Sequence, residues 1–175
     1  MRFQGIYVAA ATPFDHTGAI YRTKVQHNFE KWSRTSVAGF LVGSLAGEGP
    51  LLSDEEKVEV AAGAVKAVPE GKTVLLDVSH EGVRCAAELA RKAAGAGVHA
   101  VVSLVPHEYR GLMYGPEVQS LYFRALADQS PVPYPLFLMA ALVPWQYFAT
   151  SLTDCDRRNL GLCNNCRNEL NKLNR

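Results

Sequence analysis

The sequence predicts an α/β fold built on a parallel sheet, because short apolar strands alternate with amphipathic helices. Expected strand starts near residues 6, 39, 73, 100 and 132 give βα units of about thirty residues. The strands are continuous apolar runs with little alternation, which is typical of parallel strands covered by helices. Two architectures fit this pattern: an open doubly wound sheet, or part of a (β/α)8 barrel.

The first unit places a strand at residues 6–11, a turn-rich stretch at 12–18 and then a helix. The helix is predicted from the spacing of its apolar positions, which form a stripe along one face. That stripe consists of Val25, Phe29 and Trp32.

The second unit combines a strand at 39–42 with a helix whose start is marked by a capping box. Ser53 is the expected N-cap, and Glu56, three residues later, completes the box. The helix is expected to end before Pro69. Its predicted buried face consists of Val58, Ala61, Ala62 and Val65.

The third and fourth units repeat this plan, with strands at 73–78 and 100–105. The third helix is expected to stop at Gly95, and the fourth to start at Pro116, a favoured first-turn position. The predicted buried face of the third helix consists of Ala86, Leu89, Ala90 and Ala93. That of the fourth consists of Val118, Leu121, Tyr122 and Ala125.

Composition and charge exclude several classes of protein. An apolar share of 48% and a charged share of 20% are those of a globular protein, and a net charge of +1 favours neither nucleic acid nor an anionic membrane. No apolar run approaches the roughly 18 residues that span a bilayer, and the start lacks a secretory signal. We therefore expect a cytoplasmic protein, with the mitochondrion as the alternative, and a buried free thiol at Cys85.

The character of the chain changes near residue 134, so we divide it into residues 1–134 and a divergent, poorly packed or disordered tail at 135–175. The apolar stretch that opens the tail contains Pro135, which is awkward inside a parallel strand. Three tail cysteines, Cys155, Cys163 and Cys166, are too few for a closed zinc site without a histidine nearby. We expect no metal and no cofactor.

Five short motifs, taken together, resemble the dihydrodipicolinate synthase / N-acetylneuraminate lyase family over residues 1 to about 134. They are Gly-Ile-Tyr with Ala-Thr-Pro-Phe at 5–14, Gly-Phe-Leu-Val with Gly-Glu and Ser-Asp-Glu-Glu at 39–56, Gly-Ala-Gly-Val-His-Ala at 95–100, Pro-His-Glu-Tyr-Arg-Gly-Leu-Met at 106–113, and Ala-Asp-Gln-Ser-Pro-Val-Pro at 127–133. The fourth motif is most similar to the 4-hydroxy-2-oxoglutarate aldolase branch.

The resemblance implies an incomplete (β/α)8 TIM barrel, with about four βα units plus a fifth strand. It also implies a class I aldolase-type lyase acting on pyruvate or similar 2-oxo acids. In such enzymes a lysine on strand six forms a Schiff base with the substrate ketone, which requires free amine near neutral pH. Hydroxyl groups relay protons, and backbone N–H groups of the loop after strand two hold the substrate carboxylate.

The sequence departs from this pattern at the residues that would carry the chemistry. No lysine lies between Lys92 and Lys172. The expected Ser/Thr pair of the second loop falls on Leu45 and Ala46, although a shift of one residue would bring Ser44 into the role. The expected substrate-binding segment is therefore Ser44, Leu45, Ala46 and Gly47, and the strand-five tyrosine falls near Phe137.

Two further candidates follow the fourth strand. Tyr109 matches the proton-relay tyrosine that reaches into a neighbouring subunit, or else it is a rim aromatic at an oligomer contact. Arg110 is placed to engage a second substrate carboxylate. Residues after the third strand, Asp77, Ser79, His80 and Glu81, are interpreted as the N-cap and first turn of the next helix, with a site-facing position as the alternative.

Two hypotheses follow. In the first, the chain is a truncated lyase by family that is inactive alone, with unpaired sheet edges that favour dimerisation or low solubility. In the second, it is a non-catalytic partner or regulator of a full-length homologue. A self-sufficient enzyme that uses other residues is a third, weaker alternative.

Overall fold

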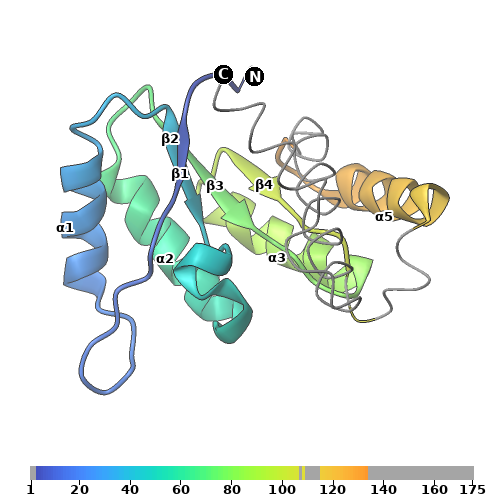
Figure 1. Cartoon of the computed structure of the whole chain (residues 1–175), viewed down its shortest axis with the longest axis horizontal. Helices are drawn as coiled ribbons and strands as arrows, with labels where there is room; N and C mark the ends of the chain where they lie inside the picture. Colours follow the sequence, from blue (N-terminus) through green and yellow to red (C-terminus); the bar gives the residue numbers. More distant parts are fainter. Residues whose placement is uncertain (1–2, 107, 109–114, 134–175) are drawn as a thin grey trace, which may run out of the picture. The chain divides into compact units, whose positions relative to one another are not determined.

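The computed structural model describes residues 3–106, 108 and 115–133 and shows a parallel four-stranded sheet (Figure 1). The strands follow one another in chain order, β1-β2-β3-β4, so each βα unit adds the next strand beside the last. Their bounds are Tyr7–Ala9, Gly39–Val42, Thr73–Asp77 and Ala100–Val102. The predicted starts of these strands are confirmed to within one residue.

Four helices pack in the same order, α1 against α2, α2 against α3, and α3 against α5. This is the helical layer of a barrel, so the incomplete (β/α)8 architecture is confirmed for the described units. The helices are α1 Arg22–Trp32, α2 Asp54–Ala67, α3 Val83–Gly95 and α5 Pro116–Gln129. Two short 3-10 turns, η1 Leu45–Gly47 and η2 Gly49–Leu51, lie between β2 and α2.

An aromatic cluster packs α1 against the sheet. Phe29 is fully buried and meets Phe40 of β2 edge-to-face, with 5.2 Å between ring centroids. Trp32 adds a second edge contact to Phe29 at 5.4 Å. The predicted apolar stripe of this helix is therefore the one that packs.

The predicted start of α2 is confirmed, but the prediction of its buried face is wrong for most residues. Ser53 and Glu56 form the predicted capping box, and the helix ends at Ala67, before Pro69. The predicted face is only half-buried apart from Ala61, because α2 packs on β2, β3 and α1 through a stripe rotated by about one residue. The buried positions are Lys57, Val60, Ala61 and Ala64.

The predicted face of α3 is confirmed, with Ala86, Leu89, Ala90 and Ala93 all buried. The expectation of a buried thiol is wrong, because Cys85 is exposed. Cys85 lies in the first turn of α3, ahead of the buried stripe that begins at Ala86.

The predicted face of α5 is wrong in part. Pro116 starts the helix as expected, but Val118 and Leu121 are exposed. The helix packs through Tyr122, Phe123 and Leu126, because its contact with α3 turns the apolar stripe toward that side.

The end of the described chain touches the free edge of the sheet. The Val101 N–H donates to the Pro133 carbonyl over 3.2 Å, so residue 133 runs alongside β4. The rest of the predicted fifth strand, the tail at 135–175 and its cysteines lie outside the described residues. Among the described residues, no helix is long and apolar enough to span a membrane.

Candidate functional site

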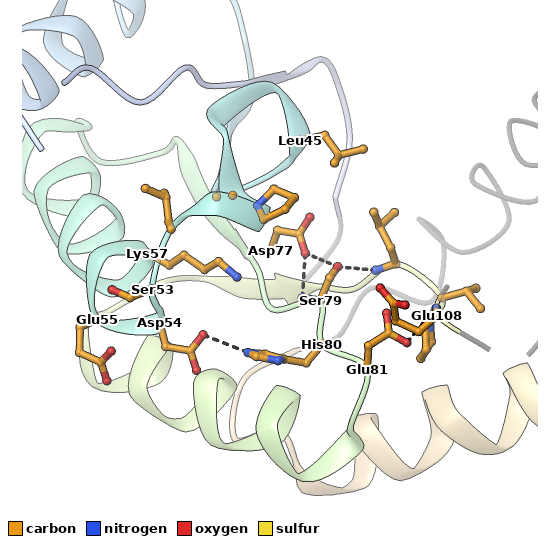
Figure 2. A pocket seen from close by; sticks show the side chains of 17 residues that line it. Leu45, Ser53, Asp54, Glu55, Lys57, Asp77, Ser79, His80, Glu81 and Glu108 are labelled. Carbon is orange, nitrogen blue, oxygen red and sulfur yellow. Dashed lines mark hydrogen bonds and ion pairs between the residues drawn. The ribbon is translucent and has the colours of Figure 1, made fainter. Parts of the chain in front are cut away.

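The carboxyl ends of β2, β3 and β4 open into a pocket of about 660 Å³ (Figure 2). In α/β barrels this end of the strands carries the functional groups. The pocket is walled by the loop after β2, by the first turns of α2, and by the segments that follow β3 and β4. Its charged and ionisable lining consists of Asp54, Glu55, Lys57, Asp77, His80, Glu81 and Glu108.

The loop after β2 is held by backbone geometry. Gly43 has a φ of +68° and Glu48 a φ of 58°, both in the left-handed region. A Cβ on Gly49 would overlap the Gly43 carbonyl, so the chain doubles back here at the distance of backbone contact. The Thr12 hydroxyl donates to the Gly47 carbonyl over 2.7 Å and ties the loop to the segment after β1.

The four loop residues expected to bind substrate differ in their exposure to solvent. Leu45 is exposed and lines the pocket, and Ala46 is exposed beside it. Ser44 and Gly47 are buried. Within the described part of the chain, the Ser44 hydroxyl is buried without a hydrogen-bond partner, and Ser44 is not among the residues that line the pocket.

The N–H groups of the same loop are largely used within it. Gly47 and Gly49 both donate to the Ser44 carbonyl, each over 2.9 Å, and Glu48 donates to the Leu45 carbonyl over 3.2 Å. A carboxylate-binding role for this loop would therefore have to use the N–H groups ahead of Gly47.

Asp77 anchors the segment after β3. It is 6% exposed, and its Oδ1 accepts from the Ser79 N–H over 2.9 Å and from the Ser79 hydroxyl. That hydroxyl in turn accepts from the Leu104 N–H over 2.7 Å, which couples the ends of β3 and β4. The interpretation of these residues as a helix cap is wrong, because α3 begins at Val83 after an N-cap glycine without a side-chain bond.

Burial raises the pKa of Asp77 above its ordinary value of 3.8, against the hydrogen bonds from Ser79 and the charge of Lys57, which act to lower it. The folded state therefore holds this proton more tightly than the unfolded state. The resulting stabilisation is present in acid and is lost as pH rises from 3.8 through the folded pKa.

We expect Asp77→Asn to gain stability relative to the wild type as pH rises from about 3 to about 7, because the amide oxygen can still accept from Ser79 and carries no charge. Asp15→Asn is the matched control of opposite sign: hydrogen bonds from Thr17 lower the pKa of exposed Asp15, so its contribution is lost in acid. Urea unfolding of both variants at each pH measures the two trends. Equal signs would contradict the burial argument.

His80 connects three elements at the rim of the pocket. Its Nε2 lies 3.0 Å from Oδ1 of Asp54 at the start of α2 (Figure 2). Its carbonyl accepts from the Tyr122 hydroxyl of α5 over 2.8 Å, and Ser103 lies 3.4 Å from the same hydroxyl. Burial raises the pKa of Tyr122, so this phenol keeps its proton and acts as a hydrogen-bond donor.

The charge of the pocket is predominantly negative. Carboxylates from α2, from the β3 loop and from the chain after β4 face it, and Glu81 accepts from the Glu108 N–H over 3.2 Å. Lys57, which is 6% exposed, is the lysine that lines the pocket. An anionic 2-oxo acid would be repelled by most of this lining, so the pocket itself is poorly suited to such a substrate.

Sequence reasoning missed Lys57 and Asp54 as pocket residues. No local pattern distinguishes them from the other charged residues of the helix start, and only the position of α2 against β3 brings them to the pocket. Tyr109 and Arg110 lie outside the described residues, so their roles stay predictions. Among the described residues, no group of His, Cys, Asp and Glu could hold a metal ion.

Parallel strands in chain order, neighbouring helices in one layer and a pocket at the carboxyl ends of the strands define part of a (β/α)8 barrel. Residues 2–140 match the dihydrodipicolinate synthetase family. The chain belongs to this family.

Two curated relatives illustrate the similarity. The 4-hydroxy-tetrahydrodipicolinate synthase of Bacillus subtilis is 27% identical over 139 residues, which cover 78% of this chain and 46% of the relative. The N-acetylneuraminate lyase of Rhizobium meliloti is 30% identical over 133 residues, covering 76% and 44%. The chain thus spans less than half the length of these relatives.

Solved structures agree on the fold. The dihydrodipicolinate synthase of Bacillus anthracis superposes with a TM-score of 0.71 at 28% identity, over 77% of this chain and 45% of that one. The N-acetylneuraminate lyase of Proteus mirabilis gives 0.69 at 23% identity, over 77% and 45%, and supports the fold alone.

Proposed function

We propose that these 175 residues keep the scaffold of a pyruvate-dependent Schiff-base aldolase without forming the Schiff base themselves. The observation that carries the proposal is the absence of any lysine between Lys92 and Lys172, the stretch in which the resemblance expects the strand-six amine. The substrate class of the parent reaction would be a 2-oxo acid such as pyruvate or 4-hydroxy-2-oxoglutarate.

The loop after β2 supports the same proposal. An apolar side chain stands at Leu45, where the resemblance expects a hydroxyl, and leucine cannot transfer a proton. Ser44 is the hydroxyl that remains in the expected segment, and it is buried instead of lining the pocket.

Borohydride trapping tests the proposal. The 175-residue chain is incubated with pyruvate and sodium borohydride, and its intact mass is measured beside that of the full-length Bacillus subtilis relative. We expect the reduced adduct on the relative and none on this chain, because the sequence has no lysine in the stretch where the strand-six amine is expected.

A Lys57→Arg variant tests whether any adduct forms on this lysine. Lys57 is the described lysine that lines the pocket, so an adduct on the wild-type chain that disappears in this variant would assign the chemistry to Lys57. Such an adduct would contradict the proposal and favour a self-sufficient enzyme.

A second candidate function is a non-catalytic partner that associates with a full-length family member. Exposed apolar side chains at both ends of the described sheet and helix layer favour association of some kind. Co-purification of the tagged chain with a full-length homologue tests this candidate, and a tagged chain recovered alone would count against it.

A further inference from the structure

The start of β4 is joined to β3 through a histidine side chain. The Val74 N–H donates to Nδ1 of His99 over 3.1 Å, and the His99 N–H donates to the Val74 carbonyl over 2.9 Å. His99 is half-buried and directly precedes β4, whereas Val74 is fully buried in β3. One histidine therefore satisfies both backbone polar groups of a core residue.

The imidazole takes the place of a backbone carbonyl. In a parallel ladder, the N–H and the carbonyl of one residue bond to two residues of the neighbouring strand that lie two positions apart. Since the Val74 carbonyl accepts from His99, the Val74 N–H would be expected to donate to the Gly97 carbonyl. Gly97 has a φ of +83°, in the left-handed region, because the chain turns here after α3. The strand pairing begins only at Ala100, and Nδ1 of His99 supplies the acceptor that the turn removes.

This bond requires a neutral imidazole. Nδ1 can accept only while it carries no proton, so the proton of the neutral ring lies on Nε2. In an imidazolium both ring nitrogens are donors, and a proton on Nδ1 would face the Val74 N–H. The N–H of a buried strand residue would then lose its acceptor, which is costly in a protein interior.

The ionisable groups around this end of the sheet do not hold a charged ring in place. Among the described residues, no carboxylate forms an ion pair with His99. Lys72, directly before β3, donates to the Thr35 and Val37 carbonyls instead. The charged side chains close to the ends of the elements that meet here are Lys66 of α2, Glu70 and Lys72 between α2 and β3, Lys92 of α3 and Asp128 of α5.

We propose that His99 makes the contact between β3 and β4 sensitive to pH: the neutral imidazole holds the start of β4 against β3, and protonation releases it. The stabilisation is present while the ring is neutral and is lost as pH falls below about 6.5, where an ordinary imidazole takes up a proton. The chain that follows β4 walls the pocket through Leu104 and Val105, so the release also weakens the support of that wall. This proposal does not depend on the missing Schiff base.

Hydrogen exchange of the Val74 amide tests the proposal at the bond concerned. The exchange rate in the 175-residue chain is measured by NMR and divided by that of an unstructured peptide at the same pH. We expect the protection of Val74 to fall about tenfold or more between about pH 7.5 and about pH 5.5, because one hydrogen bond is lost. In a His99→Asn variant the protection should stay the same, since the amide oxygen can accept the same N–H and does not titrate.

Urea unfolding measures the effect on the whole fold. The stability of His99→Asn relative to the wild type should rise as pH falls from about 7.5 to about 5.5. His99→Leu, which has no acceptor, should be less stable than the wild type at the higher pH and approach it at the lower. His27→Asn is the matched control: His27 is exposed on α1, so this variant should follow the wild type at each pH.

Three results would overturn the proposal. Equal Val74 protection at both pH values in the wild type would show that this N–H does not depend on a neutral ring. A His99→Asn chain whose stability runs parallel to that of the wild type would show that protonation of His99 does not act on the fold. The ring nitrogen shifts of the wild type need no variant, and a proton on Nδ1 at neutral pH would contradict the geometry.

Discussion

Replacing Gly49 by alanine is expected to lower the free energy of unfolding by about 3 kcal/mol or more. The new Cβ would overlap the Gly43 carbonyl and stand 3.1 Å from the Ser44 carbonyl oxygen. All of these atoms are backbone, so no side-chain rotation can relieve the overlap, and the loop must open. The pocket loses its wall as the loop moves.

Gly95→Ala is the matched control for this prediction. Gly95 ends α3, has no atom within 4 Å of a built Cβ, and does not adopt a positive φ. Alanine there should be neutral or stabilising by up to about 1 kcal/mol, through helix propensity. Denaturant unfolding followed by circular dichroism measures both variants. A Gly49→Ala chain as stable as the wild type would show that the loop does not double back as described.

Replacing Phe29 by alanine is expected to cost about 3–5 kcal/mol, a large share of the stability of a domain this size. Phe29 is fully buried and makes edge-to-face contacts with Phe40 of β2 and with Trp32 of its own helix. Its removal leaves a cavity between α1 and β2 and removes two edge-to-face ring contacts. The same unfolding experiment measures the loss.

Leu51→Ala serves as the control for the aromatic cluster. Leu51 is largely exposed, so its truncation should change stability by no more than about 0.5 kcal/mol. If both variants lost equal stability, the aromatic cluster would not be the point at which α1 is attached.

Features encoded within a few residues could be predicted from the sequence. The capping box of α2 is one example, because the Ser53 hydroxyl and the Glu56 carboxylate satisfy N–H groups only three residues apart. The apolar stripe of α3 is another, since a run rich in alanine leaves one clear face. The order of the strands follows from the chain order of the βα units.

The rotation of α2 and of α5 could not be predicted in the same way. Each helix carries apolar residues over a wide arc, so several stripes are compatible with its period. The neighbouring element selects one of them: Val25 of α1 packs near Gly63 of α2, and α3 turns Leu126 of α5 inward. These contacts join residues more than thirty positions apart.

The residues that line the pocket could not be predicted from the sequence either. Asp54 and His80 are 26 positions apart and meet at 3.0 Å only because α2 and the β3 loop end at the same edge of the sheet. Lys57 is one of several charged residues in its helix, yet it is buried, and its charge acts on Asp77. No local pattern marks these partners.

The sequence by itself determined the order of the elements, the capping box of α2, the family and the absence of a lysine where the Schiff base would form. Only the tertiary structure decided which helix faces are buried, that the pocket lining is acidic, and which apolar side chains remain exposed at the two ends. The physical reason is range: hydrogen bonds within a turn depend on neighbours in the chain, whereas burial and electrostatic environment depend on residues that the fold brings from far away.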